Sequence, residues 1–240
     1  MRVLLAGLFS LLLTAGPPAA QDCTSCHDTD LAAFARGTHG SMACTDCHTS
    51  IKQLPHADKM PPVDCGACHG DVVKAYGGSV HGQARKTGMP DAATCASCHG
   101  KAHDIVPRKE AGSKVAKRNL PETCGACHAN PEFLQRHKIP FAKPVEAYRS
   151  SVHGRAVARG EEAAAGCSDC HGSHGILASK DGKAQVNRDQ VAATCGACHS
   201  DVQTAYEGSV HGKAAKAGFK GAPVCTDCHA PNAHCLPSST

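Results

Sequence analysis

The residues best equipped for chemistry are 17 cysteines and 17 histidines, and most of them belong to one repeated pattern in this chain of 240 residues. The sequence reads Cys-x-x-Cys-His eight times, and these motifs use all but one of the cysteines. The eight motifs are Cys23/Cys26/His27, Cys44/Cys47/His48, Cys65/Cys68/His69, Cys95/Cys98/His99, Cys124/Cys127/His128, Cys167/Cys170/His171, Cys195/Cys198/His199 and Cys225/Cys228/His229. Such a repeat predicts one chemistry that is built eight times.

The spacing within each motif suits the covalent attachment of haem. Two cysteines on one helical turn can form thioethers with the two vinyl groups of one porphyrin, and the next residue then directs its imidazole at the iron. Zinc knuckles, disulfides and thiol-exchange sites also use paired cysteines, but none of them requires a histidine after every second cysteine. The sequence therefore predicts eight covalently bound haem c groups.

A second set of histidines matches the number of irons. A low-spin electron-transfer haem has a second axial ligand, so eight irons need eight further ligands. Nine histidines lie outside the motifs, and the ninth, His137, falls outside the repeat and is predicted not to be a ligand. The predicted distal ligands are His39, His56, His81, His103, His153, His174, His211 and His234. None of the methionines recurs with the motifs, so methionine ligation is not predicted.

The positions of these histidines divide the chain into four units, each with two motifs and two further histidines. One further histidine lies between the two motifs and precedes a glycine, and we call it the spacer histidine. The other comes soon after the second motif, and we call it the following histidine. The spacer histidines are His39, His81, His153 and His211, and the following histidines are His56, His103, His174 and His234. The segments Cys65–Gly82 and Cys195–Gly212 are identical at 14 of 18 positions, which indicates duplication of a two-haem module.

The reach of the chain limits which iron a following histidine can bind. His174 comes three residues after His171, and three residues span at most about 10 Å. That is too short to pass round a porphyrin already held on its other face. Each following histidine is therefore expected to bind a haem other than the one beside it, and the sequence leaves open which one.

An aromatic residue lies five positions before each spacer histidine: Phe34, Tyr76, Tyr148 and Tyr206. In three units it also lies seven residues, or two helical turns, after a motif histidine. Short helices are therefore predicted through Asp71–Tyr76 and Asp201–Tyr206. Because Phe34 fills the same place without a hydroxyl, the rings are predicted to pack on haem planes rather than to take part in redox chemistry.

The composition predicts an unusual interior. The chain has no tryptophan and only eight phenylalanines and tyrosines, so side chains alone supply little apolar core. The predicted fold class is mostly irregular with short α-helices, built around haems in four repeated di-haem modules. The predicted boundaries are a signal peptide at 1–20 and di-haem modules at 21–62, 63–107, 121–178 and 192–237, which we number units one to four.

The N-terminus has the features of a secretory leader. Arg2 precedes an apolar stretch of 13 residues, Val3 to Ala15, which is shorter than the ~20 residues that a membrane span needs. A periplasmic or extracellular location is therefore predicted. The formal charge is +4, but sixteen haem propionates would outweigh it, so nucleic-acid binding is not predicted. Cys235, the one cysteine outside the motifs, is predicted to be a free thiol, with a link to another chain as the alternative.

The doubled motifs, the Ser-Val-His-Gly element and the Cys-x-x-Cys-His-Gly-x-x-His element resemble the multihaem (octahaem) cytochromes c of the doubled-CXXCH, cytochrome c3-like family, over residues 23–236. The resemblance implies an iron-containing electron carrier of the periplasm or outer surface that serves anaerobic respiration. It implies partners among other cytochromes or a quinol-oxidising membrane complex.

Electron transport through eight bis-histidine haems is therefore the predicted function, and no enzymatic activity is predicted. Two alternatives stay open on the sequence. The first is a multihaem reductase that keeps one iron open to substrate. The second is an oligomer, in which the chain is the subunit of a conducting extracellular filament.

Overall fold

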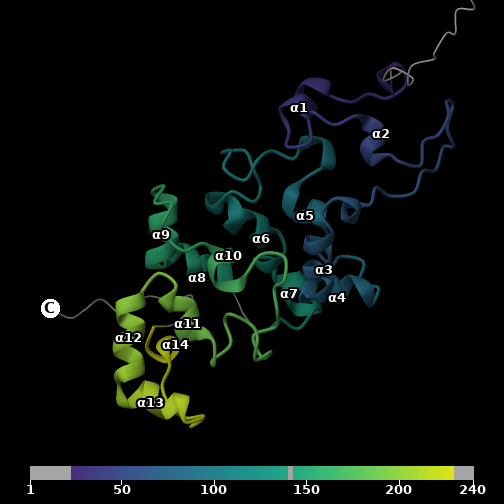
Figure 1. Cartoon of the computed structure of the whole chain (residues 1–240). Coiled ribbons are helices and arrows are strands. Elements are labelled where there is room, and N and C mark those ends of the chain that lie inside the picture. The colour runs from purple at the N-terminus through teal and green to yellow at the C-terminus, as the bar shows by residue number, and fades with distance from the viewer. Residues whose placement is uncertain (1–22, 140–142, 230–240) are drawn as a thin grey trace, which may run out of the picture.

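The computed structural model describes residues 23–139 and 143–229, and these form short helices joined by turns and loops (Figure 1). The described residues contain no strand, and the longest helices have nine residues, which confirms the predicted class of short helices and irregular segments. The predicted signal peptide, 1–20, lies outside the described residues. Figure 1 shows that the elements follow one another through the molecule roughly in sequence order, from α1 and α2 at one end to α12–α14 at the other.

The elements, with η marking a 3-10 helix, alternate between motif turns and the helices between them. The first part of the chain contains η1 (Cys23–Ser25), α1 (Leu31–Arg36), α2 (Cys44–Cys47), η2 (Cys65–Ala67), α3 (Gly70–Gly78), α4 (Val80–Lys86), α5 (Cys95–His99), η3 (Ala102–Asp104) and η4 (Lys117–Asn119). The second part contains α6 (Leu120–His128), α7 (Pro131–Arg136), α8 (Pro144–Ser150), α9 (Val152–Ala158), α10 (Cys167–His171), α11 (Val191–Gly196), α12 (Ser200–Gly208), α13 (Val210–Lys216) and α14 (Cys225–Cys228). The helices predicted through Asp71–Tyr76 and Asp201–Tyr206 are present as α3 and α12.

Each Ser-Val-His-Gly element forms a sharp corner between two helices. The serine lies between the helices, donates its hydroxyl to the carbonyl of the tyrosine three residues before it, and accepts from the glycine three residues after it. At the α3–α4 corner these two bonds of Ser79 measure 2.7 and 3.1 Å, and Ser79 is 1% exposed. The corners α8–α9 and α12–α13 repeat the same pair of bonds with Ser151 and Ser209. The spacer histidine is thus the second residue of a short, rigidly capped helix.

The glycine after each spacer histidine is required by close packing of the corner. A Cβ atom at Gly82 would lie 2.0 Å from the backbone oxygen of Tyr76, and one at Gly212 would lie 2.2 Å from that of Tyr206. Even in unit one, where the serine is missing, a Cβ atom at Gly40 would lie 2.4 Å from the oxygen of Ala35. Any larger residue would push the two helices apart and move the imidazole beside it.

The tyrosine before each corner fastens the helix pair to the second motif of its own unit. The Tyr76 hydroxyl donates to the carbonyl of Ala93 at 2.6 Å, and the Tyr148 hydroxyl donates to that of Ala165 at 3.0 Å. The Tyr206 hydroxyl donates to the carbonyl of Pro223 at 3.1 Å. Each acceptor comes two residues before the first cysteine of a motif, so the hydroxyl fixes where that motif begins.

The connecting stretches before units three and four also pack onto the unit that follows. Lys117 donates to the carbonyls of Glu162 and Ala164 and lies 3.1 Å from Asp169 of the second motif in unit three. Arg188 bonds in the same way to Asp227, 2.9 Å away, and to the carbonyl of Ala222 in unit four. These basic residues therefore hold the second motif together with the tyrosine, whose hydroxyl bonds to the carbonyl next to the one that each base contacts.

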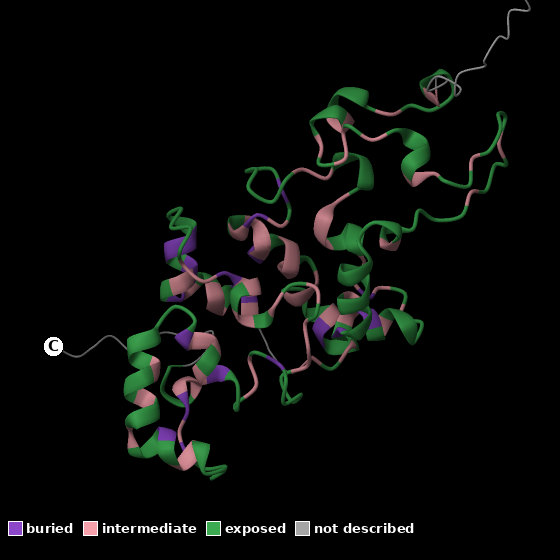
Figure 2. Cartoon of the chain, viewed as in Figure 1, coloured by how far each residue is buried: buried purple, intermediate pink, exposed green. Residues whose placement is uncertain are grey.

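The apolar core is thin. Among the described residues the buried hydrophobic side chains are Ala92, Ala116, Leu134, Val145, Ala156, Val157, Ala184, Val191, Ala222 and Val224, of which only leucine is larger than valine. Figure 2 shows them as small separate groups rather than as one core. Direct contact between side chains therefore contributes little to holding the units together, since stabilisation by burial scales with the apolar area removed from water.

Replacing Gly82 with alanine should damage the α3–α4 corner, because the new Cβ atom meets a backbone oxygen that cannot move away. Overpacking of this kind costs about 1–3 kcal/mol, which lowers the midpoint of thermal unfolding by roughly 3–10 °C in a chain of this size. Thermal unfolding followed by circular dichroism measures the shift. The control is Gly78→Ala, because a Cβ atom at Gly78 meets nothing within 4 Å. Equal midpoints for the two variants would contradict the close packing.

Candidate functional site

The motifs share a tight backbone turn that gathers their three side chains. In five motifs outside or at the ends of helices, the backbone N–H of the motif histidine donates to the carbonyl of the first cysteine, at 2.8 to 3.0 Å. These histidines are His27, His48, His69, His199 and His229. The bond closes one helical turn, so both thiols and the imidazole belong to a single turn. This is the local geometry that covalent attachment of one porphyrin requires.

The second cysteines of three motifs lie just beyond the helix that enters the motif. Cys26 follows η1, Cys68 follows η2, and Cys198 comes two residues after the end of α11. The N–H of each donates to the carbonyl of the first cysteine of its motif, at 3.2 to 3.4 Å, which is the bond of a 3-10 turn. At these motifs the turn is therefore tighter than a regular α-helical turn. Cys127 and Cys170 instead lie within the α-helices α6 and α10.

The exposure of the second cysteines also differs between motifs. The thiol-bearing residues Cys26, Cys68 and Cys198 are exposed, whereas Cys127 is half-buried. The Sγ atom of Cys26 is 3.7 Å from the hydroxyl oxygen of its neighbour Ser25. The structure thus places three of these four predicted porphyrin anchors at the surface and not in an interior formed by side chains. Their role as haem anchors stays a prediction.

Cysteines of successive motifs come together where one unit meets the next. Burial is the main cause that raises the pKa of the Cys98 thiol, and Cys124 of the following motif, followed by Cys127, adds to the effect. Burial likewise raises the pKa of Cys170, and Cys198 of the following motif adds to it. The second motif of one unit is therefore a neighbour of the first motif of the next, at the junctions between units two and three and between units three and four.

The two motifs of one unit lie side by side. Contact with Cys167 of the second motif, together with burial, raises the pKa of the Cys124 thiol in the first motif. Burial followed by contact with Cys95 raises the pKa of Cys65, and burial followed by contact with Cys225 raises that of Cys195. The first cysteines of paired motifs are therefore neighbours in units two, three and four. No disulfide joins the sixteen cysteines of the described residues.

The histidines gather in facing pairs, and each pair joins a motif histidine to a predicted distal ligand. The ring centroids of the six pairs are 5.6 to 6.2 Å apart. The pairs are His27 with His56, His39 with His69, His48 with His103, His81 with His128, His99 with His174, and His153 with His199. The structure thus brings together twelve of the sixteen predicted iron ligands, two at a time.

The separation within the pairs suits a metal ion between them. A bond from a metal to an imidazole nitrogen is about 2 Å long, so two rings on opposite sides of one ion have centroids about 6 Å apart. Imidazoles that only stack or hydrogen-bond have no reason to repeat this distance at six places. In the closest pair, the Nε2 atoms of His27 and His56 are 3.4 Å apart and the ring planes differ by 4°. Two bonds of about 2 Å on opposite sides of one ion separate the nitrogens by about 4 Å, so these rings fit the two axial positions of a haem iron once they move about half an ångström apart.

The pairing follows one rule from unit to unit. The spacer histidines His39, His81 and His153 each face the first motif of the next unit. The following histidines His103 and His174 each face the second motif of the preceding unit, as their short reach from their own motif requires. Only the pair His27–His56 lies within a single unit, where it joins the first motif to the following histidine of unit one.

Backbone hydrogen bonds accompany the exchange of histidines at two of the junctions. The N–H of Thr38, just before His39, donates to the carbonyl of Ile105, two residues after His103, at 2.7 Å. The N–H of Val80, just before His81, donates to the carbonyl of Ile176, two residues after His174, at 2.8 Å. The spacer segment of one unit is thereby fixed against the following segment of the next, and this sets both imidazoles of the junction.

Burial keeps several of these imidazoles in the form that binds metal. Burial, followed by the neighbouring His128, lowers the pKa of His81, and burial alone lowers that of His128. The same cause lowers the pKa of His99, whose partner His174 adds to the effect. A neutral imidazole has a lone pair for a metal, whereas the imidazolium ion has none. The electrostatics at these pairs therefore favour ligation.

The histidines outside the six pairs differ in their surroundings. His171 and His229 complete the set of motif histidines, and His211 occupies its spacer position on α13. The predicted ligand His234 and the predicted free thiol Cys235 lie outside the described residues. His137 lies on Phe133, with ring centroids 4.4 Å apart, and its Nε2 is 3.0 Å from a carboxylate oxygen of Asp91. An aspartate, not an imidazole, is thus the polar partner of His137.

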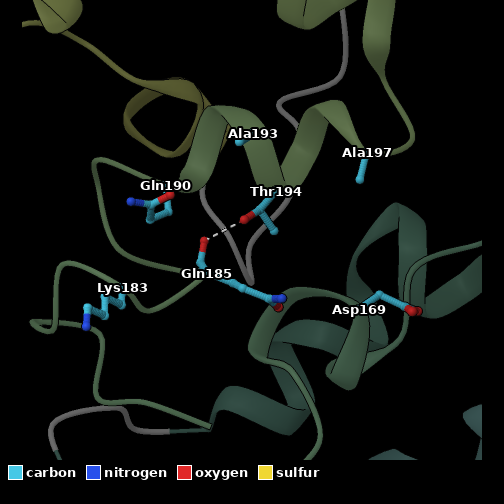
Figure 3. Close-up of a pocket in the computed structure, with 7 residues that line it drawn as sticks. All are labelled: Asp169, Lys183, Gln185, Gln190, Ala193, Thr194 and Ala197. Carbon is cyan, nitrogen blue, oxygen red and sulfur yellow. Dashed lines mark hydrogen bonds between the residues drawn. The ribbon is translucent and has the colours of Figure 1, made fainter. Parts of the chain in front are cut away.

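Two adjoining cavities lie beside the sixth motif. One of about 300 Å³ opens between α10 and α11 and is lined by polar side chains that include Asp169, Gln185 and Thr194 (Figure 3). The second, of about 410 Å³, shares Lys183 and Gln185 with the first and also borders His171 and His174. Lys183 offers these cavities a cation for a carboxylate group.

Two features of the site were not foreseen from the sequence. The tyrosine hydroxyls bond to backbone carbonyls, although the rings were expected only to pack on haems. The basic residues Lys117 and Arg188 clamp the second motifs of their units. The sequence does hold a signal for this clamp, because each of these residues comes seven before the first motif of its unit.

Within the described ranges 23–139 and 143–229, no cluster of three or more His, Cys, Asp and Glu side chains is arranged to hold a metal ion on its own. In the same ranges no helix is long and apolar enough to cross a membrane. A scan against protein-family models and searches of the curated proteins and of the solved structures found no match to this chain.

Replacing Tyr148 with phenylalanine should loosen the second motif of unit three, because the half-buried carbonyl of Ala165 loses its donor. The expected loss is about 1 kcal/mol of unfolding free energy at neutral pH. Burial raises the pKa of Tyr148 to about 12, so the bond persists below the ordinary tyrosine value and is lost as the pH rises through 12. Urea unfolding of the two proteins should therefore differ at pH 8 and converge near pH 12.

The control for this variant is Thr204→Ala, which removes an exposed hydroxyl that bonds only within α12. Its unfolding free energy should change by less than about 0.5 kcal/mol. A constant difference between the wild type and Tyr148→Phe over the whole pH range would count against the role of the hydroxyl.

Proposed function

We propose that the protein is an electron carrier that binds eight haem c groups, each held by one Cys-x-x-Cys-His motif and a second imidazole. The observation that carries the proposal is the set of six imidazole pairs at 5.6 to 6.2 Å, each of which combines a motif histidine with a histidine from elsewhere in the repeat. When bound, each haem would supply an iron that takes up and releases one electron.

The chain's own residues have distinct roles in this proposal. The paired cysteines anchor the porphyrins, the motif histidines take the proximal position, and the spacer and following histidines take the distal position. Ser79 and its equivalents, the tyrosine hydroxyls, Lys117 and Arg188 are positioning residues, because they fix the turns that present the imidazoles. The basic clamps also stand close to the second motifs, where they can interact with carboxylates of the bound group.

The thin apolar core supports a fold of four di-haem modules in which the cofactor fills the interior. A chain of this length normally buries many large apolar residues, whereas the largest buried ones described here are a single leucine and four valines. A large flat apolar group at each motif would occupy the space between the short helices. The motif histidines His69, His128 and His199 would then join consecutive modules through the spacer histidines that face them.

The order of the motifs in space supports conduction along the molecule. Helix α6, with the fifth motif, packs against both α5, with the fourth, and α10, with the sixth. Helix α11, which enters the seventh motif, packs against α14, with the eighth. The fourth to sixth motifs, and the seventh and eighth, are therefore neighbours in sequence order, which suits transfer between them.

The pairs favour a carrier over a reductase. A reductase needs an axial position that is open to substrate, and at six motifs the structure provides an imidazole for that position. The predicted leader and the resemblance to multihaem cytochromes support a location in the periplasm or at the outer surface and a role in anaerobic respiration. Its redox partners would be other cytochromes or a quinol-oxidising membrane complex.

The first test is the mass and optical spectrum of the protein matured by a host with the cytochrome c attachment machinery. We expect eight haems per chain by mass spectrometry and a low-spin spectrum after reduction. The matched control is the double variant Cys95→Ala and Cys98→Ala. It should attach haem at every motif except the altered one. A colourless protein, or one that binds zinc in place of haem, would end the proposal.

The second test concerns the distal ligands. His174→Ala should leave the iron opposite His99 with an open position, so one high-spin ferric haem should appear in the electron paramagnetic resonance spectrum. His137→Ala should leave the spectrum unchanged, because His137 faces Asp91 rather than an imidazole. If both variants kept the wild-type spectrum, the assignment of His174 would be wrong.

A further inference from the structure

The second motifs of the four units differ in the charge of the turn that joins their two cysteines. In units one, three and four, the residue before the second cysteine is an aspartate: Asp46, Asp169 and Asp227. Unit two has Ser97 in the same place. The turn of the fourth motif therefore lacks a carboxylate that the other second motifs have.

The side chain at this position has the same structural role in all four turns. Each aspartate accepts a hydrogen bond from the backbone N–H three residues before it, at 2.7 to 2.8 Å. The hydroxyl of Ser97 accepts the corresponding bond from the N–H of Thr94 at 3.0 Å. The four turns are therefore capped alike, and the exchange of aspartate for serine changes the charge of the turn while it keeps the cap.

A lysine lies on the turn of the fourth motif. The Nζ atom of Lys114 donates to the carbonyl of Ser97 at 3.1 Å. The stem of the same side chain lies over the end of the motif, where its Cδ atom would be 3.6 Å from a Cβ atom at Gly100. Lys114 forms no ion pair with any described residue, so no carboxylate of this part of the chain cancels its charge.

The connecting segment that carries Lys114 recurs after the second motif of unit three, with a neutral residue in place of the lysine. Thr123 donates its hydroxyl to the carbonyl of Lys114 at 2.6 Å, and Thr194 donates to that of Gln185 at 2.7 Å (Figure 3). The Oε1 atom of Gln185 would be 3.8 Å from a Cβ atom at Gly172, which follows its motif as Gly100 follows the fourth. Gln185 is thus the uncharged equivalent of Lys114.

The aspartates of units three and four are paired with basic residues, whereas that of unit one is not. Asp169 is 3.1 Å from Lys117, and Asp227 is 2.9 Å from Arg188. Asp46 forms no ion pair with any residue of the described ranges. Over these groups, the charge is positive at the fourth motif, balanced at the sixth and eighth, and negative at the second.

Two equivalent cysteines experience this difference in charge. Burial and the thiol of Cys124 raise the pKa of Cys98, and Lys114 acts against them by lowering it. At Cys170, burial raises the pKa, and the carboxylate of Asp169 raises it further. The charged side chains therefore make the electrostatic potential more positive at the fourth motif than at the sixth.

Resting on the proposed function, we infer that Lys114 and Ser97 give the fourth haem the highest reduction potential among the haems of the four second motifs. A cation near a haem stabilises the reduced form, because reduction adds one negative charge, and a carboxylate destabilises it. An electron shared among these four haems is therefore held mainly at the fourth. In that step the ferric iron of the fourth haem gains one electron and the ferrous iron of a neighbouring haem loses it, with no bond formed or broken.

The fourth motif lies where a held electron can pass on to the next unit. Helix α5, which contains this motif, packs against α6, which contains the fifth. His99 of the fourth motif also faces His174 of unit three, with ring centroids 6.0 Å apart. The electron is thus held at the junction between units two and three.

The experiment follows the fourth haem alone in the full-length, haem-loaded His174→Ala protein. Its high-spin ferric signal should disappear from the electron paramagnetic resonance spectrum as the iron opposite His99 is reduced, so samples poised at a series of potentials give the midpoint of this one haem. Adding Lys114→Gln should lower the ratio of reduced to oxidised haem at a fixed potential at least about threefold, because a positive charge is lost. Lys114→Arg should keep the ratio of the parent protein.

A matched pair of variants at Ser97 separates charge from shape in the same background. Ser97→Asp gives the fourth motif the residue of the other units and should lower the midpoint as Lys114→Gln does. Ser97→Asn is the control, because its side chain is equally large and also accepts a bond from the N–H of Thr94 but carries no charge. Equal midpoints for the two variants would contradict the role of the charge.

The rank of the haems is tested by a second opened iron. His103→Ala should leave the iron opposite His48 with the same open position, so the second and fourth haems can be compared with the same ligation. The midpoint of the fourth haem should be the higher of the two, since Lys114 lies at its turn and the unpaired Asp46 lies at the other. Added salt should narrow the difference, because it screens exposed charges.

Two results would overturn the inference while leaving the proposed function intact. One is an unchanged midpoint of the fourth haem after Lys114→Gln in a protein with eight bound haems. The other is a midpoint of the fourth haem at or below that of the second. Failure to attach haem at all would instead contradict the proposed function, so the two failures can be told apart.

Discussion

The structure depends on imidazoles that face each other in pairs, with ring centroids about 6 Å apart. The units have little apolar surface to bury against one another, and the largest buried hydrophobic residue described is Leu134. Five of the six pairs join different units, so a metal ion bound between the rings of each pair would link consecutive units. A metal ion that binds both rings of a pair converts each gap into a strong cross-link, because the free energy of metal binding becomes free energy of folding.

The surrounding polar bonds are best understood as the means of holding these rings in place. Ser79, Tyr76 and Gly82 fix one helix corner, and the same three residue types recur in units three and four. Each bond contributes only about 1 kcal/mol to stability, so their value lies more in precision than in energy. A ligand on a capped and fastened helix loses less conformational freedom on binding a metal than one on a loose loop. The elements outside the motifs thus prepare positions that the proposed cofactors would lock.

The sequence predicts which residues form the site better than it predicts which histidines pair with each other. The motifs, the spacer histidines and the helices through Asp71–Tyr76 and Asp201–Tyr206 follow from residue types and spacing alone, because they depend on local geometry. The partners of the spacer histidines do not, since the distance along the chain sets only the farthest point that a residue can reach. His39 could have served its own unit or the next, and in the structure it faces His69 of the next unit, beside the bond from the N–H of Thr38 to the carbonyl of Ile105.

The hydroxyls of the tyrosines and the basic clamps could not be predicted for a related reason. Phe34 stands where the other units have tyrosine. The sequence therefore predicts a role for the ring but not the hydrogen bond of the hydroxyl. In the structure Phe34 meets the ring of His103 edge-on, with centroids 5.9 Å apart, and so contacts a predicted ligand of the next unit directly. Unit one can omit the hydroxyl because Thr38 and Phe34 both fasten its corner to unit two. The role of each residue depends on a neighbour far along the chain.

The exchange of ligands between neighbours explains why unit one differs from the others. In unit one, the first motif histidine and the following histidine are paired with each other and not across a junction. These are His27 and His56, and the structure pairs them within the unit. His56 comes eight residues after its motif, whereas the equivalent histidines come four, three and five after theirs. Eight residues can span up to roughly 28 Å, which is enough to bend back to the first motif of the same unit. The longer segment between His48 and His56 therefore allows His56 to pair with His27 of its own unit.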